Sequence, residues 1–163
     1  MDKSKELIES YFREAQRLHY YKRDFEAANR YYLKVIRLEP NHINAINGLA
    51  QNLRLNIKDY PAAINAYSKV IELDKRFEHA IFRRGICYGC VGNFQAQFDD
   101  YSFHIQYIKS NGEEYISRAL ISQKLGRFDN VLSDCWIAIF IKGVNDKYLI
   151  KSLNEAYGKY GYN

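Results

Sequence analysis

The 163-residue sequence has only two prolines, three cysteines and one methionine, and its longest apolar run covers just residues 135–141. A membrane-spanning helix needs about 20 apolar residues, so this run is too short to form one. An odd number of cysteines does not indicate a disulfide framework and favours reduced thiols. The polar, charged start of the chain does not resemble a secretory signal peptide. These absences predict a cytoplasmic protein without a membrane anchor.

The sequence also lacks any concentration of charge. It has 24 Lys and Arg residues against 19 Asp and Glu, a net charge of +5, and the basic residues are dispersed. A mild, dispersed excess does not by itself indicate nucleic acid or lipid headgroups as partners. RNA binding remains a less favoured alternative, because fifteen tyrosines accompany the basic residues.

Catalytic motifs are missing as well. The sequence contains no phosphate-binding glycine loop, no Gly-x-Ser-x-Gly and no His-Glu-x-x-His. Asp99 and Asp100 are adjacent, so on a helix their side chains would diverge by about 100°. The four histidines show no ligand spacing. We therefore expect a protein that is not an enzyme and that has no catalytic residues, cofactor or metal.

Internal similarity at a spacing of about 34 residues is the strongest pattern in the chain. One column, with steps of 35, 34 and 34, consists of the aromatic residues Phe25, Tyr60, Phe94 and Phe128. The same steps connect Tyr32, Tyr67, Tyr101 and Cys135. They also connect Ile36, Ile71, Ile105 and Ile139. Several columns in one register indicate a repeat architecture.

Each repeating unit is predicted to form two helices. Within residues 25–38 apolar side chains recur at helical spacing. Residues able to cap a helix N-terminus stand before three of the second helices: Asp24, Asp59 and Asn93. Gly92 and Gly126 stand where the first helices of the later units should end. The small residues Ala50, Gly85 and Ala119 would let paired helices approach closely.

These residues resemble the tetratricopeptide repeat family, in which a first helix with apolar, small and aromatic positions is followed by a turn and a second helix. The segments 80–101 and 25–40 match the family pattern best. The resemblance implies an all-α fold, a right-handed superhelix of helix pairs. It implies one domain over residues 1–163, with repeats at about 9–42, 43–77, 78–111 and 112–145 and a C-terminal solvating helix at 146–162.

Some positions depart from the family pattern. His19 replaces an aromatic residue, while Gln97 and Val131 replace the usual alanine. The second unit also has one extra residue near Ile57 or Lys58. Because the stability of such arrays is close to a sum over neighbouring repeats, several imperfect units are still expected to stack.

The stretch with Cys87 and Cys90 allows two interpretations. A Cys-x-x-Cys spacing is compatible with a metal or redox pair, and residues three apart on a helix share a face. A structural zinc site needs four ligands, however, and no second Cys or His pair of matching spacing is present. We favour ordinary helix packing for both cysteines.

The first helices of stacked repeats line a concave groove, where we expect a peptide to bind. The predicted groove residues are Arg13, Arg17, Asn44, Asn47, Gln51, His79, Phe82, Arg83 and Ile86. The set resembles the carboxylate clamp of family members that bind chaperone tails. Arg13, Arg17, His79 and Arg83 stand at clamp positions, and Asn47 would replace an amide that Gly48 lacks. The resemblance implies an adaptor or co-chaperone-like module for an acidic or C-terminal peptide.

A structural or self-associating scaffold is the alternative function. Several tyrosines have no position in the repeat pattern, and they lie near the two ends of the chain: Tyr11, Tyr20, Tyr21, Tyr31, Tyr157, Tyr160 and Tyr162. Because amphipathic aromatic residues are enriched at interfaces, these ends would be the docking surfaces.

Overall fold

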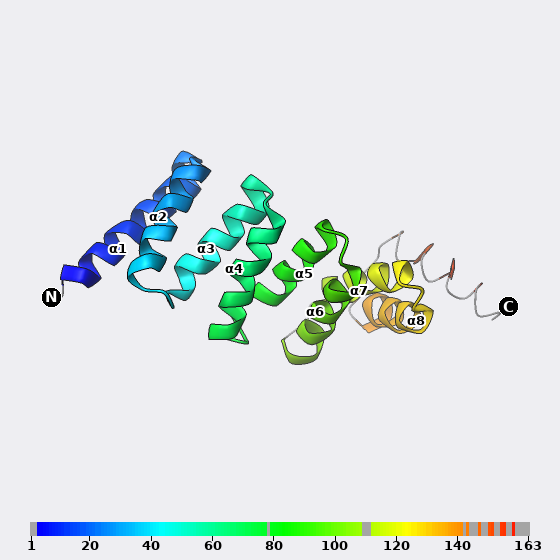
Figure 1. Cartoon of the computed structure of the whole chain (residues 1–163). Coiled ribbons are helices and arrows are strands. Elements are labelled where there is room, and N and C mark those ends of the chain that lie inside the picture. Colours follow the sequence, from blue (N-terminus) through cyan, green and yellow to red (C-terminus); the bar gives the residue numbers. More distant parts are fainter. Residues whose placement is uncertain are drawn as a thin grey trace. The chain divides into compact units, whose positions relative to one another are not determined.

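A computed structural model describes residues 3–77, 79–108 and 112–141, together with residues 143, 147, 150, 151, 154, 155 and 158. All regular elements in these residues are helices (Figure 1). The helices fall into two compact units, Met1–Cys87 and Tyr88–Asn163. The all-α prediction is confirmed.

Unit 1 contains four complete helices and most of a fifth. They are α1 (Lys3–Gln16), α2 (Phe25–Leu38), α3 (Ile43–Asn52), α4 (Tyr60–Leu73) and α5 (Ala80–Cys90), whose last three residues belong to unit 2. Successive helices from α1 to α4 pack against each other as antiparallel neighbours. This is the arrangement expected of stacked helix pairs.

Unit 2 contains α6 (Phe94–Tyr107), α7 (Glu113–Lys124) and α8 (Phe128–Trp136). Helix α7 packs against both α6 and α8. The predicted C-terminal helix at 146–162 lies for the most part outside the described residues. Within it, Glu155 accepts a hydrogen bond from Gln123 on α7 at 2.5 Å.

Side-chain caps begin the second helices, as the sequence predicts. Asp24 accepts a hydrogen bond from the backbone N–H of Ala27 at 3.0 Å. Asp59 and Asn93 accept equivalent bonds, each at 3.1 Å. Each cap satisfies an N–H that has no partner within its helix. These side chains therefore set where α2, α4 and α6 begin.

The first helices of unit 1 end in π-helical turns. Helix α1 continues as η1 (Arg17–Lys22), and α3 continues as η2 (Leu53–Ile57). Each turn is followed by a residue in the left-handed region, Arg23 with φ 55° and Lys58 with φ 62°. The extra residue of the second repeat, near Ile57 or Lys58, lies in this part of the chain. A π turn accommodates one more residue than an α turn. A third π segment, η3 (Ile137–Ile141), follows α8.

The core of each unit lies between its paired helices. In unit 1 small residues pack against fully buried tyrosines, with Ala28 and Tyr32 in one cluster and Ala63 and Tyr67 in the next. In unit 2 Ala119 packs with Val131 and Cys135. The small residues let the helix backbones approach, and the rings fill the space between the repeats. The repeat columns found in the sequence are thus largely core positions.

Candidate functional site

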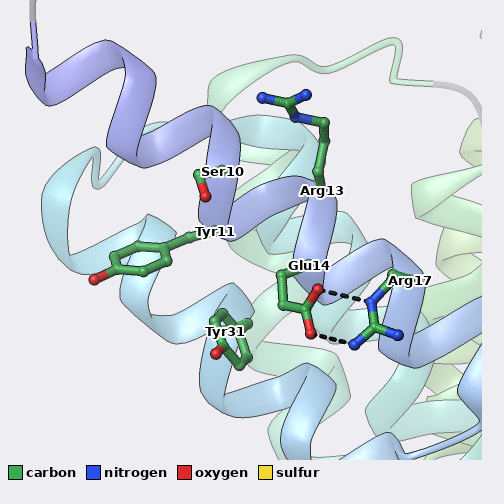
Figure 2. Close-up of a pocket in the computed structure, with 6 residues that line it drawn as sticks. All are labelled: Ser10, Tyr11, Arg13, Glu14, Arg17 and Tyr31. Carbon is green, nitrogen blue, oxygen red and sulfur yellow. Dashed lines mark hydrogen bonds and ion pairs between the residues drawn. The ribbon is translucent and has the colours of Figure 1, made fainter.

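Arg13 and Arg17, the predicted groove residues of the first repeat, already have acidic partners. Arg17 forms a two-pronged ion pair with Glu14, at 2.8 Å and 2.7 Å (Figure 2). The pair lowers the pKa of Glu14 through its hydrogen bond with Arg17. Arg13 points away from this pair in Figure 2, and its side chain is 71% exposed and lies 3.6 Å from Glu9. Both charges are therefore partly neutralised within α1 and η1.

An open surface pocket of about 540 Å³ surrounds this ion pair. Its walls come from α1, η1 and α2, and Figure 2 shows its lining residues: Ser10, Tyr11, Arg13, Glu14, Arg17 and Tyr31. The rings of Tyr11 and Tyr31 meet edge to face with centroids 5.9 Å apart. The ammonium group of Lys34 lies 4.3 Å from the Tyr31 centroid. These two tyrosines thus belong to a local aromatic and cationic cluster.

The groove residues of the second repeat lie along α3. Asn44 is exposed in the first turn, while Asn47 and Gln51 are half-buried further along the helix. The side-chain oxygen of Asn47 is buried and has no hydrogen bond. Asn47 therefore has an unused acceptor.

The third repeat contributes residues at the start of α5. His79 is exposed and stands just before the helix with φ 63°, so it is not on a helical turn as the repeat pattern predicts. Phe82, Arg83 and Ile86 are half-buried on α5. All nine predicted groove residues lie in unit 1.

Only glycine fits at position 48, because the ring of Tyr32 on the preceding helix α2 packs directly against it. A Cβ atom at Gly48 would lie 2.6 Å from Cζ of Tyr32, closer than real contacts allow. The Tyr32 ring is fully buried, and its hydroxyl is 3.3 Å from Nδ1 of His19. Nε2 of His19 in turn is 3.4 Å from the amide of Asn56. The missing clamp amide at Gly48 thus has a steric cause, because the Tyr32 ring occupies the space.

One repeat further along, arginines replace two of these three residues, while the tyrosine is kept. His19, Tyr32 and Gly48 become Arg54, Tyr67 and Arg83 after a step of 35 residues. Tyr67 is fully buried, and its hydroxyl has no hydrogen bond of good geometry. Burial raises the pKa of Tyr67, and the nearby Arg54 and Arg83 act against this rise. Both guanidinium groups therefore lie close to the same hydroxyl.

Sequence reasoning treated Tyr67 only as a packing residue and left Arg54 out of the principal site residues. The 35-residue register contained the signal for both, because it aligns Arg54 with His19 and Arg83 with Gly48. Arg54 and Arg83 both act electrostatically on the hydroxyl of Tyr67. This cluster, defined as Arg54, Tyr67 and Arg83, is called the two-arginine cluster below.

The two cysteines of α5 do not share an environment, since Cys87 is buried and Cys90 is exposed. The third, Cys135 on α8, is also buried, and this burial raises the pKa of its thiol to about 12. Among the described residues no three His, Cys, Asp or Glu side chains lie together as metal ligands would. No helix within the described part of the chain is long and apolar enough to span a membrane.

Comparison with known proteins supports the repeat pattern and the fold. Residues 8–42 match the model of the tetratricopeptide repeat family. No curated protein matches the chain in sequence. A crystal structure of MamA protein superposes with a TM-score of 0.84 and 23% identity over 96% of this chain and 84% of the other. The chain has the tetratricopeptide-repeat fold.

Two further tetratricopeptide-repeat structures concern peptides. YrrB, described as having an unusual peptide-binding site, has a TM-score of 0.80 and 14% identity over 98% of this chain and 84% of its own. The first repeat domain of Spaghetti (RPAP3), bound to the HSP90 peptide SRMEEVD, has a TM-score of 0.66 and 16% identity over 74% of this chain and 94% of its own. The predicted superhelical class is confirmed by these likenesses. At such identities they show the fold and not a shared ligand.

Proposed function

We propose that the chain is a non-enzymatic protein-interaction module that binds an acidic or C-terminal peptide segment along the first-helix face of unit 1. The feature that carries the proposal is the set of basic side chains that the repeat pattern assigns to that face, Arg13, Arg54 and Arg83. Similarity to two structures whose descriptions concern peptide sites supports it. The location in the cytoplasm, the single domain and the four repeat boundaries stay predictions.

Electrostatics gives the proposal its mechanism. Arginine binds carboxylates through two parallel hydrogen bonds, and charge-assisted bonds are roughly twice as strong as neutral ones. Phe82 and Ile86 are half-buried next to Arg83 on α5 and would supply apolar contact beside the charges. An extended acidic peptide would then bind by charge and by apolar anchoring, with an affinity that falls as salt screens the charges.

Selection from a library of random peptides, displayed with free and with blocked C-termini, tests this function. We expect the selected peptides to be rich in Asp and Glu and to bind several-fold more weakly at about 0.5 M salt than at about 0.05 M. Selection without an acidic preference, or binding that salt does not change, would contradict the proposal. The exposed Arg30 on α2 gives the matched control, because R30Q removes one positive charge from a helix that does not line the groove.

Self-association is the second candidate function, and exposed aromatic residues favour it. Tyr21 in η1 is 82% exposed, and Phe140 in η3 is 65% exposed and packs on Trp136 with ring centroids 5.7 Å apart. The terminal tyrosines at 157, 160 and 162 lie outside the described residues. Light scattering over a wide concentration range separates the candidates. A monomer throughout would exclude the scaffold, and Y21S and F140S would dissociate an oligomer that depends on these rings.

A further inference from the structure

The two-arginine cluster combines two positive side chains with one buried hydroxyl. Arg54 and Arg83 are half-buried, and both guanidinium groups act on the hydroxyl of Tyr67. Neither forms an ion pair with an acidic side chain in the part of the chain that the structure describes. Two like charges that share one partly buried location repel each other more strongly than they would in water. An anion between them would relieve this repulsion.

Two buried polar atoms of the cluster make only imperfect hydrogen bonds. The Tyr67 side chain is 0% exposed and its hydroxyl interacts with Arg54, yet neither this hydroxyl nor the buried Nε of Arg54 has a hydrogen bond of good geometry. Buried polar groups are nearly always hydrogen-bonded, so an unsatisfied pair needs an explanation. A site that completes its hydrogen bonds only when a ligand draws the guanidinium groups into line would account for both atoms.

The corresponding tyrosines of the first and third repeats have hydrogen-bonding neighbours of a different kind. In the preceding repeat the corresponding hydroxyl of Tyr32 interacts with the imidazole of His19. In the following repeat the hydroxyl of Tyr101 accepts a hydrogen bond from Gln97 at 3.0 Å. Each of these tyrosines thus has a hydrogen-bonding neighbour other than arginine. At Tyr67 the two arginine side chains that act on the hydroxyl are both positively charged.

We propose that the two-arginine cluster is a binding site for a single carboxylate, which the guanidinium groups of Arg54 and Arg83 hold while Tyr67 positions Arg54 from beneath. A carboxylate suits the site because its two oxygens can accept parallel bonds from planar guanidinium donors. The site rests on the proposed function and adds to it the residues that recognise the acidic group. It differs from the clamp that the family resemblance implies, because Arg54 and Tyr67 have no place in that clamp.

Side-chain NMR of arginine tests the site without a known partner. The Nε–Hε signals of the full chain would be followed during titration with N-acetylglycine, which carries a terminal carboxylate, and with the α-amide of N-acetylaspartic acid, which carries only a side-chain carboxylate. We expect saturable shifts of the Arg54 and Arg83 signals with at least one compound, and the tighter one identifies the source of the carboxylate. Acetamide and equal ionic strength of sodium chloride should leave both signals in place.

Arg30 serves as the internal control in the same spectra, because it is exposed on α2 and is not a predicted groove residue. An equal or larger shift of its signal would overturn the proposal, and so would the absence of any response from Arg54 and Arg83. Tighter binding of inorganic phosphate than of either carboxylate would overturn the assigned ligand class. R54Q and R83Q should each weaken carboxylate binding at least about tenfold, whereas R30Q should not.

Further variants separate a binding role from a structural one. R54K keeps the charge but loses the planar donor pair, so it should weaken binding by less than R54Q while retaining the helical circular-dichroism spectrum. Y67F should shift the Arg54 signal before any ligand is added and weaken binding by a few-fold. Binding by R54Q and Y67F equal to that of the unaltered chain would contradict the assigned roles.

The test also distinguishes this site from the broader function. Selected peptides that bind while the carboxylate probes leave Arg54 and Arg83 unchanged would refute the site and leave the interaction module intact. Carboxylate binding without any selected peptide would refute the module and leave the site.

Discussion

The two units bury different kinds of polar side chains. In unit 1 the buried polar residues of the described chain are His19 and Asn52. In unit 2 they include four ionisable ones: Asp100, His104, Glu114 and Asp134. Neutral groups need only hydrogen bonds, whereas buried charges also need a charged partner or a shifted pKa. The stability of unit 2 should therefore depend more strongly on individual pairs.

In unit 1, hydrogen bonds between amide groups satisfy the buried side chain of Asn52. The Asn52 amide at the end of α3 donates to the backbone oxygen of Phe25 and to Asn29, both at 2.6 Å. It also accepts a bond from Asn56 at 2.9 Å. This network joins the first repeat to the second without any charge. The family model matches residues 8–42, which lie within unit 1.

In unit 2, an ion pair satisfies the buried carboxylate of Asp134. Arg118 on α7 donates to both carboxylate oxygens of Asp134 on α8, at 2.8 Å and 2.6 Å, and Asp134 is 0% exposed. Desolvation raises the pKa of Asp134 even though Arg118 acts in the opposite direction. Each partner is thus needed to compensate the burial of the other.

Breaking this pair should have the largest effect. R118L leaves an unpaired buried carboxylate and should lower the free energy of unfolding by about 3 kcal/mol. Urea denaturation of the full chain, with hydrogen exchange measured in peptides from 112–141, would show the loss. The double variant R118L/D134L should recover most of the stability, while R13Q on α1 should change little. A small effect of R118L alone would contradict the contrast between the units.

Adding one methyl group at Gly48 should have the next largest effect. Because Tyr32 fills the space beside Gly48, G48A should destabilise unit 1 by about 1–3 kcal/mol. A double-mutant cycle with Y32L should show a strong coupling between the two changes. The matched change in unit 2, G89A, places Cβ 2.5 Å from the amide oxygen of Gln97, a flexible group that can move. G89A should therefore cost less, and an equal cost would count against steric exclusion by the tyrosine.

Acidification should affect unit 1 through His19. Burial lowers the pKa of His19 from its ordinary value of 6.5, so the unfolded chain binds a proton at a higher pH than the folded chain does. This contribution to stability is present above pH 6.5 and is lost as the pH falls towards the lowered pKa. Hydrogen exchange of residues 17–57 between pH 7.5 and 5.5 measures this loss.

The neutral variant H19Q is the control for this pH dependence. It should lose the part of the pH dependence that His19 causes, because glutamine does not titrate. Asp134 should contribute with the opposite sign, because its pKa is raised from 3.8 and its folded form gains a proton first. A pH profile of unit 1 that H19Q leaves unchanged would refute the assignment to His19.

Exchanging the turn residues should have the smallest effect. Arg23 and Lys58 adopt the left-handed conformation that Gly92 and Gly126 adopt in unit 2. R23G and K58G should stabilise the chain by about 0.5–1 kcal/mol each, and G92A should destabilise it by about 1 kcal/mol. Thermal melting of the three variants measures the differences. Destabilisation by R23G would show that the Arg23 side chain has a role beyond its backbone.

The comparison shows what the sequence could and could not predict. Caps such as Asp24 and turns such as Gly92 were predictable because a residue type performs each role locally. The left-handed Arg23 and Lys58 were not, because neither residue type favours that conformation. The Arg17–Glu14 pair follows from helical spacing, but its strength depends on side-chain rotamers. The position of the Tyr67 hydroxyl depends on how deeply the ring inserts between the helices. The sequence periodicity does not predict this depth.

Gly48 has a consequence for protein engineering. The position at which a family clamp carries an asparagine is filled here by a ring from the preceding repeat. Grafting that asparagine onto the chain would therefore fail as a single substitution, and Tyr32 would have to be shortened in the same step. Shortening Tyr32 would in turn remove the partner of His19. The residue types that one repeat can carry on its first helix are thus limited by the packing of the repeat before it, so substitutions here have to be designed in pairs of repeats.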